Sequence, residues 1–92
     1  MPKNDSQGGE NMIPDDMALP TLVRQEVESL LDTIKRSSGR EGAERAGLRA
    51  EGFVLGIERL RALRPADIEA LYLVFEQAVE LRCGELSAES SV

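Results

Sequence analysis

The residues of this chain that are able to do chemistry are carboxylates, serines and one cysteine, because histidine is absent. The serines lie mainly at 37–38 and near the C-terminus, with no base beside them to activate a nucleophile. The glutamates follow polar helix faces, where solvent surrounds them. Cys83 ends an apolar helical pattern, which is typical of a small buried side chain. The sequence therefore predicts no catalytic, cofactor or metal site, and a protein that is not an enzyme.

The composition indicates one small acidic domain. The chain has 92 residues, 41% of them hydrophobic, and a formal net charge of −6. A negative balance disfavours a protein whose main task is to cover nucleic-acid phosphates. No apolar run approaches the roughly 18 residues of a membrane span, and residues 1–16 lack the apolar segment of a signal peptide. We expect a cytoplasmic protein with no membrane segment. Because a single core of this size is marginally stable, we also expect a homodimer.

Periodicity and helix breakers predict an all-α fold of three helices, over residues 20–36, 40–63 and 65–83. The breakers between them are Ser37–Gly39 and the segment that ends at Pro65. Gly84 follows the last periodic residue, where a helix commonly ends. Outside this domain, taken as residues 14–83, we expect a disordered N-terminal tail over 1–13 and a frayed acidic C-terminal tail over 84–92.

The apolar residues exceed what three helices can cover. The main face of the third helix contains Ile68, Leu71, Tyr72, Phe75, Val79 and Cys83, and is widened by Val74, Ala78 and Leu81. The second helix has two apolar faces, one with Phe53, Ile57 and Leu60 and one with Leu48, Leu55 and Ala62. Two apolar faces predict a helix packed between neighbours, and its many small residues predict a close approach by another helix. The surplus is typical of a surface that binds protein.

Leu73 lies outside the main face of the third helix, among glutamates. An isolated three-helix body gives this side chain no reason to be apolar, so we interpret it as an anchor with a polar rim that selects a basic or polar partner. The predicted partner-binding residues are Leu48, Leu55, Tyr72, Leu73, Glu76 and Glu80. The predicted core includes Phe53, Ile57, Phe75 and Val79.

Residues 43–61, AERAGLRAEGFVLGIERLR, resemble the helix-turn-helix of phage-repressor-type DNA-binding proteins. The resemblance rests on the run Ala43–Leu48, whose glycine turns between two helices, and on Phe53, which locks them together. It implies an alternative function as a DNA-binding repressor. The matching recognition helix presents Glu51 and Leu55, which suit base edges and phosphates poorly, so nucleic acid is the less favoured partner.

The overall plan, a short acidic tail before a compact helical body with a surplus apolar helix, is similar to that of the QslA-type quorum-sensing anti-activators of pseudomonads. The segment LRPADIEALYLVFEQAVELR, residues 63–82, carries this resemblance. It implies binding to the ligand-binding domain of a LuxR-type transcriptional regulator, which blocks dimerisation of that regulator and so its DNA binding. A third possibility is a purely structural helical homodimer, in which self-association buries all of the surplus apolar surface.

Overall fold

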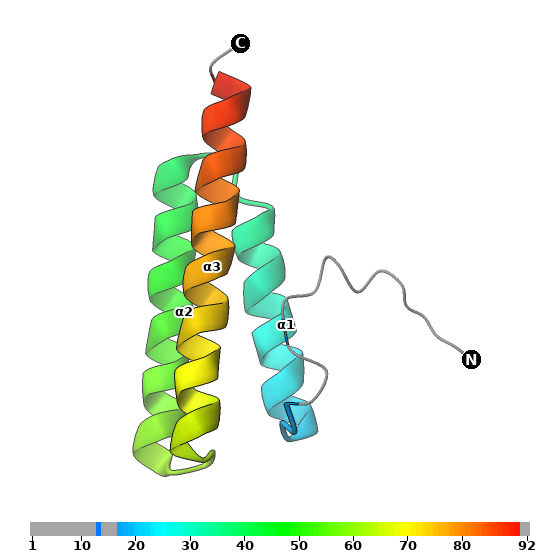
Figure 1. Cartoon of the computed structure of the whole chain (residues 1–92), viewed down its shortest axis with the longest axis vertical. Helices are drawn as coiled ribbons and strands as arrows, with labels where there is room; N and C mark the ends of the chain where they lie inside the picture. Colours follow the sequence, from blue (N-terminus) through cyan, green and yellow to red (C-terminus); the bar gives the residue numbers. More distant parts are fainter. Residues whose placement is uncertain (1–12, 14–16, 91–92) are drawn as a thin grey trace, which may run out of the picture.

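In a computed structural model that describes residue 13 and residues 17–90, the chain forms three α-helices that run up, down and up (Figure 1). They are α1 (Thr21–Lys35), α2 (Arg40–Leu60) and α3 (Pro65–Ser90), and each packs against the other two. The connections at 36–39 and 61–64 are short, which makes consecutive helices antiparallel neighbours. No strand occurs in the described part of the chain. The all-α, three-helix prediction is confirmed.

The core lies where the apolar rows of the three helices meet. The row on α1 is the predicted stripe, with Val27, Leu30, Leu31 and Ile34 buried. The row on α2 consists mostly of small side chains, with Ala43, Ala46, Ala50, Val54 and Ile57 buried. The row on α3 contributes Ile68, Leu71, Val74, Phe75, Ala78 and Cys83. Of the predicted core residues, Ile57 and Phe75 are buried, while Phe53 and Val79 are partly buried against the core.

Gly47 is a point of close contact between α2 and α3. A methyl group built there would lie 2.6 Å from Cγ2 of Val79, so a side chain at this position would force Val79 to shift. The predicted close approach by another helix is confirmed here. It does not extend to Gly52 and Gly56, which are exposed and have open space around them.

The helix-turn-helix prediction is wrong. Residues 40–60 form one continuous helix, with no turn at Gly47, because the glycine is needed for the packing against Val79 and lies in the middle of α2. The helix ends at Leu60, three residues earlier than predicted, since Arg61 adopts the left-handed conformation at φ 56°. The Arg61 backbone N–H donates to the carbonyl of Glu58 at 3.0 Å, which completes the C-terminal cap.

The predicted C-terminal boundary is also wrong, because α3 continues through Gly84 to Ser90. No described glycine has a positive φ, and the residues after Gly84 are mostly good helix formers with no proline among them. An ion pair at 3.0 Å between Arg82 and Glu85 spans the glycine. Residues 84–90 are therefore helical rather than a frayed tail, and residues 91–92 lie outside the described part.

At the other end of the chain, the packed body begins earlier than predicted. Ile13 and Met17 are both buried in the core cluster, because they are apolar residues in an otherwise polar segment. The Arg24 guanidinium donates to the Met17 carbonyl at 2.6 Å and holds this segment on α1. The predicted tail over 1–13 is thus wrong at Ile13, and residues 1–12 lie outside the described part.

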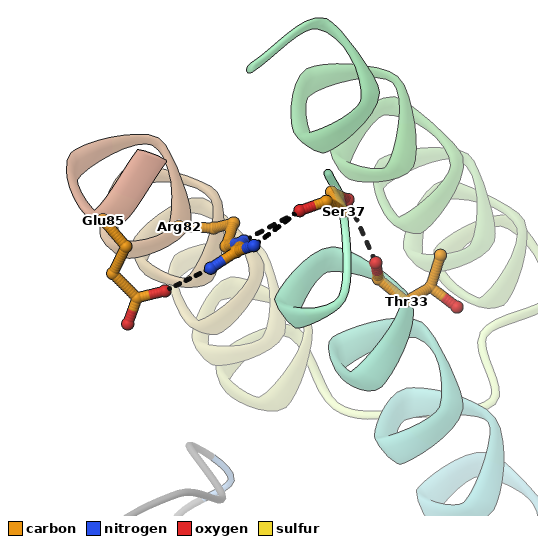
Figure 2. A network of polar contacts seen from close by, with 4 residues as sticks. All are labelled: Thr33, Ser37, Arg82 and Glu85. Carbon is orange, nitrogen blue, oxygen red and sulfur yellow. Dashed lines mark hydrogen bonds and ion pairs between the residues drawn. The ribbon is translucent and has the colours of Figure 1, made fainter. Parts of the chain in front are cut away.

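Arg82 joins α3 to the turn between α1 and α2 (Figure 2). Its Nε and Nη2 atoms donate to the carbonyl of Ser37 at 2.9 and 2.8 Å, while Nη1 donates to Glu85 at 3.0 Å. The Ser37 hydroxyl donates in turn to the carbonyl of Thr33 at 3.0 Å and closes the last turn of α1. This network fixes the upper part of α3 against the pair α1–α2, and so sets the relative positions of the helix faces.

Candidate protein-binding surface

Two contacts define how α2 and α3 lie against each other. Gly47 meets Val79 in the middle part of the two helices, and the Tyr72 hydroxyl donates to the Glu58 carboxylate at 3.4 Å closer to the turn that joins them. Because the helices are antiparallel, residues between these two points on α2 lie opposite residues between them on α3. The pair has one side toward α1 and one side away from it.

The exposed residues of α2 lie on the side away from α1. At about 100° per residue, Leu48 and Leu55 are only about 20° apart on the helix, and both point well away from the buried row that contains Ala50. Their exposed fractions are 68% and 43%. Glu51 and Glu58 lie between these leucines and α3, at a spacing of seven residues. Leu48 and Leu55 therefore form a short apolar row beside the α2–α3 seam.

The exposed residues of α3 continue this surface. Tyr72 is half-buried at the seam, and Glu76 lies one turn further along on the same flank. Leu73 and Glu80 are seven residues apart, so they share a row at the outer edge, where Leu73 is 53% exposed. Helical register thus places all six predicted partner-binding residues on one side of the α2–α3 pair. We define the α2/α3 face as Leu48, Glu51, Leu55, Glu58, Tyr72, Leu73, Glu76 and Glu80.

The environment of Tyr72 shows that the seam is acidic. Partial burial raises the pKa of Tyr72 above its ordinary value, and the negative charge of Glu58 raises this pKa further. The hydrogen bond to Glu58 and the charge of Glu51 act in the same direction. Both glutamates of α2 are therefore close enough to the phenol to act on it electrostatically.

Glu51 and Glu58 belong to the face although the sequence prediction did not include them. The spacing Glu44, Glu51, Glu58 follows the seven-residue spacing of Leu48 and Leu55, and this was the available signal. A seven-residue acidic row on one helix is ordinary in a soluble protein. Its meaning depends on what the neighbouring helix places across the seam.

Two apolar residues lie elsewhere than predicted, and a third, for which the sequence made no prediction, is also exposed. Leu60 is 80% exposed because it is the last residue of α2, at the end of the bundle. Leu81 is 55% exposed and does not widen the buried face of α3. The predicted packing of α2 between two neighbours is confirmed, since α2 contacts both α1 and α3, but these contacts leave its second apolar face, with Leu48 and Leu55, in solvent. Leu22, at the start of α1, is 79% exposed.

Other kinds of site find little support in the described residues. Cys83 is a free, buried thiol, in agreement with its predicted packing role. The described part of the chain contains no group of three or more cysteine, aspartate and glutamate side chains placed to hold a metal ion. None of its helices is both long enough and apolar enough to cross a membrane.

Comparison of the chain with models of protein families, with curated proteins and with solved structures finds no match. The argument for a function therefore comes from the geometry and charge of the α2/α3 face.

Proposed function

We propose that this chain is a small, non-enzymatic regulatory protein that binds another protein through the α2/α3 face. The observation that carries the proposal is the exposure of Leu48, Leu55 and Leu73 on one side of a body whose core is complete without them. Single exposed leucines are common on protein surfaces. Three of them on one side of the molecule, together with a half-buried tyrosine and several exposed glutamates, support the assignment of an interface.

The proposed mechanism is competition. The chain covers a surface that its partner needs for self-assembly, and so keeps the partner inactive. The resemblance to the QslA-type anti-activators indicates the ligand-binding domain of a LuxR-type transcriptional regulator as that partner. Blocking dimerisation of the regulator would prevent its DNA binding, and the chain would act in the cytoplasm without touching DNA itself.

The experiment uses the purified ligand-binding domains of the LuxR-type regulators encoded in the same genome. Calorimetric titration with this protein is expected to give saturable binding to at least one of them, and light scattering is expected to show loss of that regulator's dimer. A gel shift of the full regulator on its promoter DNA should disappear as the protein is added. If every regulator of this class stays dimeric and bound to DNA at saturating protein, the anti-activator proposal is wrong.

A second proposed property, the homodimer expected from the sequence, is favoured by a different observation. Leu22 and Leu60 are the most exposed leucines of the described residues, and they lie where α1 begins and α2 ends, at the lower end of the bundle in Figure 1. Self-association there leaves the α2/α3 face open, so the two proposals are compatible. Sedimentation equilibrium of the wild type and of Leu60→Glu tests it, because the variant is expected to be monomeric at a concentration where the wild type is a dimer.

A further inference from the structure

The charge of the α2/α3 face is almost entirely negative. Its glutamates, with their neighbours along the same helix rows, are Glu44, Glu51, Glu58, Glu69, Glu76 and Glu80, and all are exposed. The arginines nearby are Arg40 at one end of the acidic row, and Arg45 and Arg59, which by helical register lie next to the leucine row on the side away from α3. Arg40 is paired with Glu44 at 3.5 Å. Among the ion pairs of the described residues, none includes Glu51, Glu58, Glu69, Glu76 or Glu80.

This charge argues against a second copy of the chain as the occupant. A two-fold symmetric contact places the same patch of each copy against itself, so Glu51 and Glu76 of one copy would face glutamates of the other. Like charges brought together in an interface oppose association. Anionic lipid and nucleic acid are disfavoured for the same reason. The charge requires an occupant with basic side chains.

The apolar residues specify the shape of that occupant. Leu48 and Leu55 are seven residues apart, about 10 Å along the axis of α2, and Tyr72 lies across the seam from Leu55. The acidic row from Glu44 to Glu58 extends about 21 Å, which is the length of a helix of about 14 residues. The leucine row has an acidic row on its seam side, and more glutamates follow on α3. This arrangement matches a helix that has one apolar stripe and cations on the flank that faces the seam.

We infer that the α2/α3 face takes a basic amphipathic helix of the partner. The apolar stripe of that helix covers Leu48 and Leu55. Its lysines or arginines, on the flank toward the seam, pair with Glu51 and Glu58 beside Tyr72 and with Glu76 and Glu80 across the seam. The inference rests on the proposed function, and it names the chemistry of the partner segment. It also assigns self-association to a different surface of the chain.

The probe is a 14-residue helical peptide of leucine and lysine with a single apolar stripe, compared with the same peptide carrying glutamate in place of lysine. Titration into isotopically labelled protein, followed by amide chemical shifts, is expected to move the signals of the α2/α3 face and to leave those of α1 in place. The glutamate peptide is expected not to bind. Raising the salt concentration should weaken binding of the lysine peptide, because salt screens these exposed charges.

Matched variants distinguish the contribution of the α2/α3 face to peptide binding from that of the overall charge of the protein. Glu51→Gln with Glu76→Gln should lower the affinity for the lysine peptide by about threefold to thirtyfold, as expected for the loss of two exposed ion pairs. Glu26→Gln with Glu89→Gln makes the same change to the net charge of −6 on exposed residues away from the face, and should leave the affinity unchanged.

Two results would overturn the inference. The first is that the two double variants weaken binding of the lysine peptide equally, which shows attraction to net charge alone. The second is that the peptide changes the amide chemical shifts of α1 rather than those of the α2/α3 face. Failure of the proposed function is distinguishable from both. If a regulator domain binds the protein and Leu73→Gln abolishes that binding while Glu51→Gln with Glu76→Gln does not, the proposed function stands and the basic helix is wrong. If the lysine peptide shifts the signals of the α2/α3 face but no regulator domain binds the protein, the basic-helix inference stands and the proposed function is wrong.

Discussion

Leu73 and Phe75 are neighbours on α3 with opposite expected roles, and substituting each in turn tests how the chain divides folding from binding. Leu73 keeps 53% of its surface exposed, whereas Phe75 keeps 2%. Full burial of a leucine side chain is worth about 1.5–3 kcal/mol, so folding recovers roughly half of this at Leu73. Glutamine retains good helix propensity and adds no charge beside Glu69 and Glu76. Leu73→Gln is therefore expected to lower the free energy of unfolding by about 1 kcal/mol.

Phe75→Ala opens a cavity in the core and is expected to cost about 3–5 kcal/mol. The whole domain is expected to have about 5–14 kcal/mol of stability, so this variant should be close to unfolding. In binding, the order reverses. If Leu73 is a desolvated anchor, Leu73→Gln should weaken partner binding by about thirtyfold or more, which corresponds to about 2 kcal/mol.

Urea unfolding followed by circular dichroism, together with calorimetric titration of the regulator domain, decides between these roles. The midpoint of thermal unfolding of Leu73→Gln should fall by roughly 4–8 °C, the shift expected for 1 kcal/mol in a domain of this size. If Leu73→Gln unfolds the protein, the leucine belongs to the core and the reasoning about the face is refuted. If it folds and binds the partner as the wild type does, Leu73 is merely exposed.

Three further predictions follow from local geometry. Gly47→Ala should destabilise the protein by about 1–3 kcal/mol in urea unfolding because the methyl group has no room, whereas Gly52→Ala, with open space, should stabilise it by up to about 1 kcal/mol. Arg61→Gly should stabilise it by about 0.5–1 kcal/mol in the same assay, because glycine adopts the left-handed conformation without strain; a loss of stability would contradict the cap assignment. An ultraviolet titration of Tyr72, the single tyrosine, should give a midpoint above its ordinary value near 10, which Glu58→Gln lowers. Since the unfolded chain ionises first, the free energy of unfolding should decrease as the pH rises from about 10 through the folded-state pKa.

Local signals in the sequence predict most of the fold, and the exceptions have physical causes. The breakers before Arg40 and Pro65 place the starts of α2 and α3 correctly, and spacing identifies the buried stripe of α1. Spacing does not show how far one helix extends past its neighbours, so Leu60 looks like a core residue and is exposed. Gly84 looks like a helix end, but a glycine ends a helix only when the backbone turns there, and nothing in the following residues favours a turn.

The site was predictable on each helix separately and not across the seam. The exposure of Leu73 follows from its glutamate neighbours on α3, and that of Leu48 from the second apolar face of α2. The pairing of the two helices, in which Gly47 meets Val79 and Tyr72 meets Glu58, is not specified by a pattern on either helix alone. That pairing brings Glu51 and Glu58 to the same side as Tyr72, and gives the apolar row its acidic border.

The size of the face limits how tightly one helix can bind to it. Covering the exposed fractions of Leu48 and Leu55, which are 68% and 43%, contributes about 2–3 kcal/mol when full burial of each is worth about 1.5–3 kcal/mol. Association costs at least about 4 kcal/mol, so the leucines alone do not give micromolar binding. The ion pairs with the glutamates and the cover over Tyr72 must supply the rest. An isolated peptide is therefore expected to bind in the micromolar to millimolar range, where chemical shifts report it well. A regulator that is held tightly must contact more of the surface than this one face, or bind two copies of the chain at once, so that the second contact forms at high effective concentration.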